Sequence, residues 1–371
     1  MHKATVTILP FCIMIAVCIG CSSSSSETPG RLYSTAYVYG EWEIGLPEEL
    51  GLDLTAAERA LNDIIGDRNT LSFLVVKDGF LVYEYYADGH DQESLFDTAS
   101  VTKSLVSALV GIAIDNGYIL GADTKLIEFM HGLNEDNKEI TIEHLLTMTD
   151  GWHWPELPPL ISGSDRSRML FPEIPTDIHE IYLATNNLVR LNPPGTVFNY
   201  NSYSTNLLSA VIQIATGMFT EYFAYEYLFS VIGITSYRWP RWPYSYFAAG
   251  DNVSMTSRNL ARFGQLYLNN GRWGETQVIT EQWVIDSTQR QSAGFPAISP
   301  HGYGYQWWID QIDGHHMFFA MGMGGQHVFV IPDLSIVAVV TRQLTPATTN
   351  NSSIIPLQSF KNFIRSAVLT E

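Results

Sequence analysis

The segment from Leu105 to Ile114 constrains the fold most, because it is apolar on every face that a helix would have. It reads LVSALVGIAI, so only Ser107 and Gly111 interrupt the larger apolar side chains. A helix that is apolar all round is buried inside a protein. The segment therefore predicts a central core helix, and Asn116 followed by Gly117 predicts its end.

Ser100 and Lys103 stand just before this segment, three residues apart, which predicts that they share one face of the helix. A serine hydroxyl becomes a good nucleophile when a neighbour takes its proton. Burial among apolar groups favours the neutral, basic form of a lysine, and the positive end of a helix dipole favours negative charge on a serine oxygen. The pair also fits a serine N-cap followed by a surface lysine, and two residues alone leave both interpretations open.

Composition and charge narrow the classes of function. The chain has 371 residues, 46% of them hydrophobic, which is enough for one large core or two coupled ones. Acidic residues outnumber basic ones 38 to 20, and the net charge of -18 argues against nucleic acid or anionic lipid as a partner. A neutral or cationic small molecule is the expected substrate.

The positions of the cysteines and histidines argue against a metal or another cofactor. All three cysteines lie at positions 12, 18 and 21, so the rest of the chain has no disulfide, thiol nucleophile or cysteine metal site. His315 and His316 are adjacent, and adjacent strand residues point to opposite faces. No HExxH spacing occurs, and we expect no metal and no cofactor.

The first residues predict export and a lipid anchor. A short basic start and an apolar stretch from Ile8 to Ile19 are too short to span a bilayer comfortably, and residues 1–20 fit a signal peptide. Cys21 and the serines after it resemble the start of a bacterial lipoprotein, with residues 21–35 as a flexible tether. Cys18 departs from the usual leucine, so an ordinary secretory signal or a short anchor stays an alternative. The resemblance implies a lipid on Cys21 and a location in the cell envelope, facing the periplasm or the exterior, with Ser22 fitting outer-membrane sorting.

Strand patterns occur at both ends of the remaining chain, and helix patterns lie between them. Residues 72–86 form two β-rich runs joined by Asp78 and Gly79, a strong hairpin signal, after a helix at about 55–65. Strands return in GYGYQWWI from Gly302, HHMFFAM, QHVFVIP and SIVAVVT, with Asp313, His315 and His316 in a turn and a closing helix at 351–369. This order predicts one domain over 36–371, with a sheet lobe (36–117 and 251–371) and an inserted helical lobe (118–250).

Five motifs in a fixed order resemble one known family. They are TASVTKS, ITIEHLLTMTDG, PPGTVFNYNS, MTSRNLARFGQLYLNNG and GMGGQ, and together they span nearly the whole mature chain. The chain is similar to the serine β-lactamase and penicillin-binding protein superfamily, specifically to its class C-like hydrolases. The resemblance implies an α/β (α+β) fold of β-lactamase/transpeptidase type, in which an antiparallel sheet is flanked by helices and carries an all-helical lobe.

The resemblance also implies roles for particular residues. Ser100 would be the nucleophile, Lys103 its general base, and Tyr200 the residue that relays protons to the leaving group. The backbone N–H groups of Ser100 and Met323 would form the oxyanion hole. Ser202, Gly322 and Gly324 would line the substrate site. Tyr200 as a packed core tyrosine, and the glycines as aids to close strand packing, remain alternatives.

Two departures bear on the substrate. Class C β-lactamases carry Tyr-x-Asn where this chain has Ser202 in the third position, and Lys-Thr-Gly where the segment 320–323 has no cation. Tyr-x-Ser with Gly-x-x-Gly-Gln instead resembles the esterases and 6-aminohexanoate-dimer hydrolases. We expect hydrolysis of an ester or amide of a small or peptide-like substrate. A D-alanyl-D-alanine carboxypeptidase, a weak β-lactamase, and a penicillin-binding-type sensor without turnover stay as alternatives.

Overall fold

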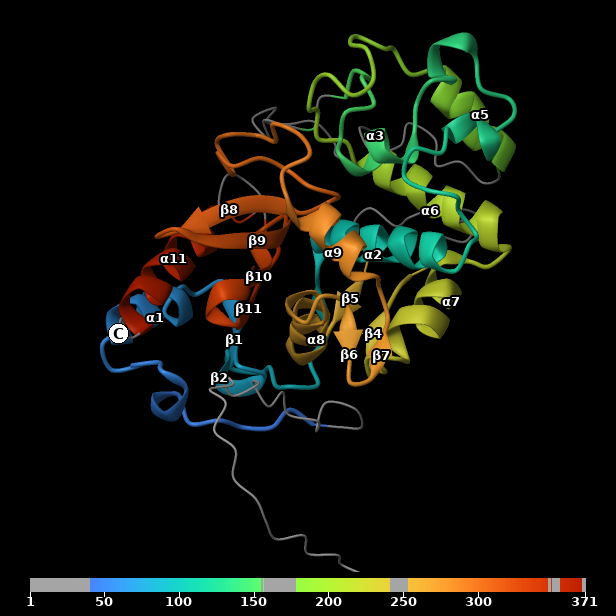
Figure 1. The fold of residues 1–371 in the computed structure, drawn as a ribbon. Helices are drawn as coiled ribbons and strands as arrows, with labels where there is room; N and C mark the ends of the chain where they lie inside the picture. The colour runs from blue at the N-terminus through green and yellow to red at the C-terminus, as the bar shows by residue number, and fades with distance from the viewer. Residues whose placement is uncertain are drawn as a thin grey trace, which may run out of the picture. The chain divides into compact units, whose positions relative to one another are not determined.

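A six-stranded antiparallel sheet forms the centre of the computed structural model, which describes residues 41–154, 156, 178–240, 253–345, 348 and 354–368. Its strand order is β2-β1-β11-β10-β9-β8. The strands are β1 (Thr70–Lys77), β2 (Phe80–Tyr86), β8 (Trp308–Ile312), β9 (His315–Gly322), β10 (Gln326–Ile331) and β11 (Ile336–Arg342). Both ends of the chain thus build one sheet, as the sequence predicts (Figure 1).

Tight turns connect the outer strands. Asp78 and Gly79 have φ values of 49° and 87°, which is the positive-φ pair that a two-residue hairpin requires, so the predicted hairpin is confirmed. Asp313 and Gly314 make a similar turn between β8 and β9, with φ values of 49° and 91°. His315 was expected in this turn, with His316, and both instead begin β9, where each pairs with a residue of β8.

The strand expected from Gly302 begins only at Trp308. Gly302 has a φ of 110° and Gln306 a φ of 64°, and neither value fits an extended strand. The backbone N–H of Gln306 also bonds the carbonyl of Leu146. The apolar pattern of GYGYQWWI therefore reflects burial in a loop rather than strand pairing.

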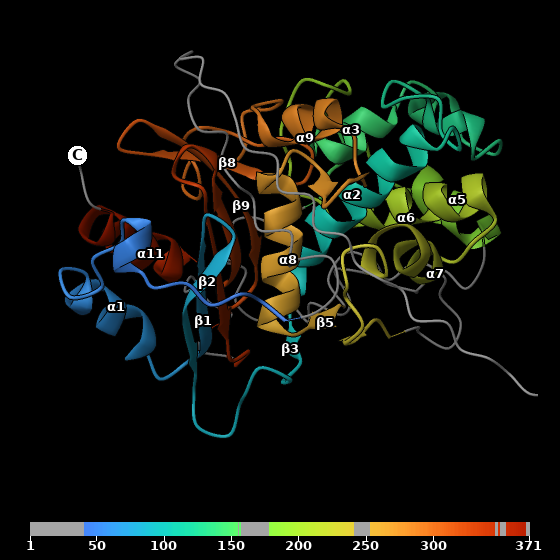
Figure 2. The same cartoon turned by 60° about the horizontal axis from the view of Figure 1, so that its bottom comes forward.

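Helices cover both faces of the sheet (Figure 2). On one face α1 (Glu58–Ile65) packs against α11 (Ile355–Ala367), which confirms helices close to the predicted 55–65 and 351–369. On the other face lie α8 (Ser257–Leu268) and α2 (Thr102–Asp115). Alternate residues of β1 enter the two cores, so this strand is buried on both sides.

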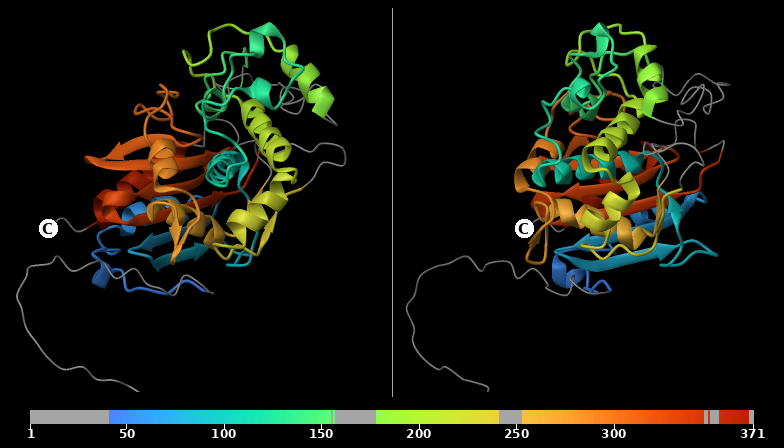
Figure 3. Two further views of the ribbon diagram at one scale, coloured as in Figure 1. Left: turned by 45° about the vertical axis from the view of Figure 1, so that its right-hand side comes forward. Right: turned by 90° about the vertical axis from the view of Figure 1, so that its right-hand side faces the viewer.

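In the helical part of the chain, α6 (Ser202–Thr216) packs against α2, as Figure 3 shows. Gly217 ends α6 with a φ of 70°, a left-handed conformation that glycine adopts easily. The other helices here are α3 (Ile142–Leu146), α5 (Ile178–Asn186), α7 (Thr220–Ala224) and the π-helical η6 (Tyr225–Phe229). Of the described helices, none by itself is long and apolar enough to cross a membrane; Ser202–Thr216 and Thr220–Phe229 meet that test only as a pair, across a 78° bend.

The remaining elements are short. They are β3 (Phe96–Asp97), β4 (Tyr237–Arg238), β5 (Ser254–Met255), β6 (Arg272–Trp273), β7 (Thr276–Gln277), α9 (Glu281–Thr288), η2 (Glu48–Leu50), η3 (Ala99–Val101), η4 (Leu126–Glu128), η5 (Glu135–Asn137) and η7 (Pro332–Leu334). Strands β3, β5 and β4 form a small sheet beside Ser100. The predicted signal peptide (1–20), Cys21 and the tether (21–35) lie outside the described residues.

Candidate active site

Ser100 lies in η3, directly before α2, and not in the first turn of the α-helix itself. Its neighbour Ala99 has a φ of 44°, an uncommon value for a residue with a side chain. The Asp97 carboxylate accepts a hydrogen bond from the Ala99 N–H at 2.8 Å and supports this conformation. The serine therefore stands on a strained turn between β3 and the central helix, a feature that often accompanies functional sites.

Lys103 is directed back to this serine. Its Nζ donates a hydrogen bond to the Ser100 Oγ over 3.0 Å, and the residue is only 1% exposed. The alternative of a serine N-cap followed by a surface lysine is therefore wrong. An amino group and a hydroxyl in this arrangement can exchange a proton directly.

Tyr200 completes the group. Its ring centroid is 5.1 Å from the Lys103 Nζ, and the ring stacks on Trp308 at 5.9 Å. Burial raises the pKa of the Tyr200 hydroxyl, the charge of Lys103 lowers it, Glu156 raises it, and hydrogen bonds with Ser100 and Lys103 lower it; the net shift is upward. Tyr200, which is about 100 residues away in the sequence, is thus brought together with Ser100 and Lys103.

The loop that carries Tyr200 is held by the segment after α3. The Asn199 N–H donates to the Met148 carbonyl at 2.8 Å, and the Asn201 side chain caps α6 by accepting from the N–H of Tyr203. Asp150 is fully buried and accepts a hydrogen bond from the Ser204 hydroxyl at 2.7 Å. Burial raises the pKa of the Asp150 carboxyl to about 6, against the opposing effect of the Ser204 bond.

Ser202 is hydrogen-bonded to Glu156, a residue that the sequence analysis does not identify. Its Oγ donates to the Glu156 Oε1 at 2.6 Å, and its N–H donates to the Glu156 Oε2 at 2.8 Å. The polar group beside Tyr200 is therefore a carboxylate as well as a hydroxyl. No short motif marks Glu156, because its contact with Ser202 joins residues 46 apart in the sequence.

Gly322 ends β9 where this strand packs against η3. A Cβ at Gly322 would lie 2.4 Å from the Thr98 carbonyl oxygen, so only glycine allows this close approach to the turn that carries Ser100. The strand end is therefore beside the serine, as an oxyanion-hole strand requires. The predicted role of the Met323 N–H stays a prediction.

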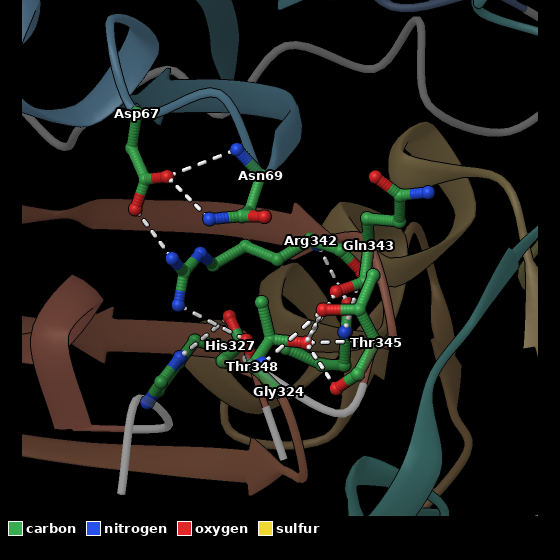
Figure 4. Close-up of polar contacts among 10 residues, drawn as sticks. Asp67, Asn69, Gly324, His327, Arg342, Gln343, Thr345 and Thr348 are labelled. Atoms are coloured by element: carbon green, nitrogen blue, oxygen red, sulfur yellow. Dashed lines mark hydrogen bonds and ion pairs between the residues drawn. The ribbon is translucent and has the colours of Figure 1, made fainter. Parts of the chain in front are cut away.

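A buried network holds the turn after β9 (Figure 4). Arg342 donates through Nη1 to the Gly324 carbonyl at 3.1 Å and forms an ion pair with Asp67. The Gln326 side chain donates to the Arg342 carbonyl at 2.8 Å and accepts from its N–H at 2.9 Å. Burial opposes the negative charge of Asp67, but a bond from the Asn69 N–H and the Arg342 charge hold its pKa below the usual value. Gly324 thus lies in a turn that is held by the side chains of Gln326 in β10 and Arg342 in β11.

The described residues contain no group of three or more His, Cys, Asp or Glu side chains placed to hold a metal ion. The chemistry that the group at Ser100 can perform is nucleophilic attack by a hydroxyl, with an amine and a phenol nearby to move protons.

Comparison with known proteins agrees with this architecture. The family model described as Beta-lactamase matches residues 54–352. The 6-aminohexanoate-dimer hydrolase of Paenarthrobacter ureafaciens is 25% identical over 338 residues, covering 84% of this chain and 82% of that protein. A candidate 6-aminohexanoate-dimer hydrolase from Bacillus anthracis has a similar structure, with a TM-score of 0.67 and 24% identity over 83% of this chain and 80% of that one. A class C β-lactamase structure gives a TM-score of 0.67 at 12% identity, covering 85% of this chain and 97% of that one. The chain belongs to the Beta-lactamase family, within the serine β-lactamase and penicillin-binding protein superfamily of serine hydrolases.

Proposed function

We propose that this protein hydrolyses an ester or amide bond of a small substrate through an acyl-enzyme on Ser100. The observation that carries the proposal is the 3.0 Å contact between the Lys103 Nζ and the Ser100 Oγ, with the Tyr200 hydroxyl bonded to both residues. Similarity to a 6-aminohexanoate-dimer hydrolase supports an amide substrate.

In the first half of the reaction, Lys103 accepts the proton of Ser100 as the serine oxygen attacks the substrate carbonyl. The oxyanion that forms accepts hydrogen bonds from the N–H groups of Ser100 and Met323. Tyr200 donates its proton to the leaving group and regains one from Lys103 as the bond to the leaving group breaks. Water then attacks the acyl-enzyme by the same route in reverse and restores the Ser100 hydroxyl.

The charge around the site bears on substrate choice. The segment 320–323 offers no cation to hold a substrate carboxylate, and Glu156 adds negative charge beside Ser202. An anionic substrate of the penicillin type would be held poorly in such a site. We therefore expect a labelled penicillin to leave no lasting acyl-enzyme.

The test is the release of p-nitrophenol from a short-chain ester by the chain that begins at Glu27, with Ser100→Ala as the matched variant. We expect sustained turnover that the variant lacks, with an unchanged melting temperature. Labelling of the wild-type protein, and not of the variant, by a fluorophosphonate probe identifies the nucleophile. Turnover that survives in Ser100→Ala would refute the assignment, and a single burst without turnover would favour a sensor.

We also propose that the protein is exported and anchored by lipid on Cys21, facing the periplasm or the exterior. The signal-like residues 1–20 and the serine-rich tether support this location.

A further inference from the structure

The Glu156 carboxylate is fixed next to the loop that carries Tyr200. Its Oε2 accepts the Ser202 N–H at 2.8 Å and the Trp154 Nε1–H at 2.9 Å, and its Oε1 accepts the Ser202 hydroxyl at 2.6 Å. Trp154 is itself stacked on Tyr203 at 5.7 Å. Three hydrogen bonds from two anchored residues leave the carboxylate little freedom to move.

The negative charge of Glu156 acts on the phenol of Tyr200, the ring that lies beside the Lys103 Nζ. Burial raises the pKa of Tyr200 most, and the negative charge of Glu156 raises it further. The same charge acts on the buried Tyr303, whose pKa burial, Tyr200 and Glu156 all raise. A negative charge nearby makes it harder for a phenol to become a phenolate.

We propose that Glu156 is a positioning residue of the Ser100 site, whose carboxylate holds the 200–202 segment in place and keeps Tyr200 as the neutral phenol. This inference rests on the proposed function, in which Tyr200 donates a proton to the leaving group. In that step the O–H bond of Tyr200 breaks and an N–H bond forms on the departing amine while the C–N bond breaks. A phenolate has no proton to give, so the reaction of an amide requires the neutral form.

Other groups also face the Tyr200 hydroxyl, and their charges set the direction of the effect. Lys103 from α2 favours the phenolate, and the Ser100 hydroxyl from η3 bonds the phenol oxygen. Asp150 bonds Asn201, next to Tyr200, and Ser204 in the first turn of α6. Replacing Glu156 by a neutral residue removes a negative charge that raises the pKa of Tyr200. The pKa of Tyr200 should then fall.

The experiment compares full-length wild type with Glu156→Gln, which removes the charge and changes the shape little. The first measurement is kcat/KM for a p-nitroanilide and for the matching p-nitrophenyl ester between pH 6 and 11. We expect the alkaline loss of anilide hydrolysis to begin at a lower pH in Glu156→Gln than in wild type. The ester should be affected less, because p-nitrophenolate leaves without a proton.

A second measurement does not depend on turnover. Ultraviolet titration of tyrosinate, taken as the difference between each protein and its Tyr200→Phe partner, reports the ionisation of Tyr200 alone. We expect its midpoint to be lower in the Glu156→Gln background. The matched control is Ser202→Ala, which loses one hydrogen bond to Glu156 but keeps the charge, and its Tyr200 midpoint should stay near that of wild type.

An unchanged Tyr200 midpoint in Glu156→Gln overturns the inference. An equal shift in Ser202→Ala also overturns it, because the hydrogen bond and not the charge would then be responsible. If no substrate is hydrolysed even by wild type, the proposed function fails while the titration still decides the effect of Glu156 on Tyr200. The two failures are therefore distinguishable.

Discussion

Lys103 is both a buried residue of the core and the hydrogen-bond partner of Ser100. A long amine at 1% exposure would be costly to bury without partners, and here it donates to the Ser100 hydroxyl and lies over the ring of Tyr200. The same apolar helix that buries the lysine stem also fixes the position of its nitrogen. Packing and reactivity at this residue are therefore difficult to separate by simple truncation.

Lys103→Met keeps a long unbranched side chain and removes the amine, so it tests the chemistry without opening a cavity. We expect kcat/KM for ester hydrolysis to fall by roughly 10³-fold or more, because residues that act as a unit fail together. The melting temperature should stay the same or rise, since a buried polar group is replaced by an apolar one. Normal turnover in this variant would mean that another residue takes the Ser100 proton.

Asp150 gives a prediction about pH and stability. Its pKa is about 6 in the folded protein, above an ordinary value of 3.8, so the unfolded chain releases this proton at lower pH than the folded one. Between these values the folded state holds more protons, and its stability falls as the pH rises. The penalty is complete above about pH 7 and amounts to about 3 kcal/mol for a shift of this size.

Asp150→Asn removes this titration. We expect urea unfolding at pH 4 and pH 7 to show a wild-type loss of stability that exceeds the loss in the variant by about 2 kcal/mol. Every other acidic group is common to the two proteins, so the difference reports Asp150. Parallel pH dependence in the two proteins would contradict the raised pKa.

At the scale of elements, the approach of β9 to η3 sets the shape of the site. Gly322→Ala would place a Cβ 2.4 Å from the Thr98 carbonyl oxygen, and backbone atoms cannot yield as a flexible side chain can. The strand end would have to move away from Ser100. We expect kcat to fall by about 100-fold with a smaller change in KM, because removing one oxyanion donor has an effect of this order.

Gly314→Ala is the control for this variant. It lies at the other end of β9, has a φ of 91°, and leaves open space around the added Cβ. It should lose about 1 kcal/mol of stability through backbone strain and keep its activity. If the two variants lose activity equally, strain in β9 and not the approach to Ser100 is the cause.

The sequence predicts these elements unevenly, for physical reasons. Local signals sufficed for the β1–β2 hairpin, because Asp78 and Gly79 specify its turn. They failed at GYGYQWWI, where tertiary packing buries a loop that has the composition of a strand, and at Ser100, where an η3 turn precedes α2. Turns of this kind depend on long-range contacts such as those of β9.

The residues of the site, like the elements, divide into those that the sequence predicts and those that it does not. Ser100, Lys103 and Tyr200 could be chosen from ordered motifs and are found together. Glu156, Trp308 and Arg342 could not, because each acts through a contact between segments that are distant in the sequence. A carboxylate, an indole or a guanidinium that supports a reactive group carries no local pattern of its own.

At the scale of the whole molecule, the described residues contain the site of the proposed reaction. The first 35 residues contain the signals on which the proposed location depends. All described residues belong to one compact unit that includes both sheet faces and the helices around α6. The net charge of -18 opposes simple electrostatic attachment to anionic lipid. Membrane attachment of this protein should therefore depend on a covalent lipid rather than on its surface.

Cys21→Ser tests that dependence, because it removes the thiol that would be acylated and changes no described residue. We expect wild type to fractionate with membranes and to incorporate a labelled fatty acid, whereas Cys21→Ser should do neither and should keep its kcat/KM for ester hydrolysis. Cys18→Ser is the matched control, since it changes a nearby thiol in the leader and should leave lipid incorporation intact. Membrane association that persists in Cys21→Ser without any label would mean that an uncleaved leader holds the protein. Loss of label in both variants would instead show that the leader sequence, and not the Cys21 thiol alone, is required for processing.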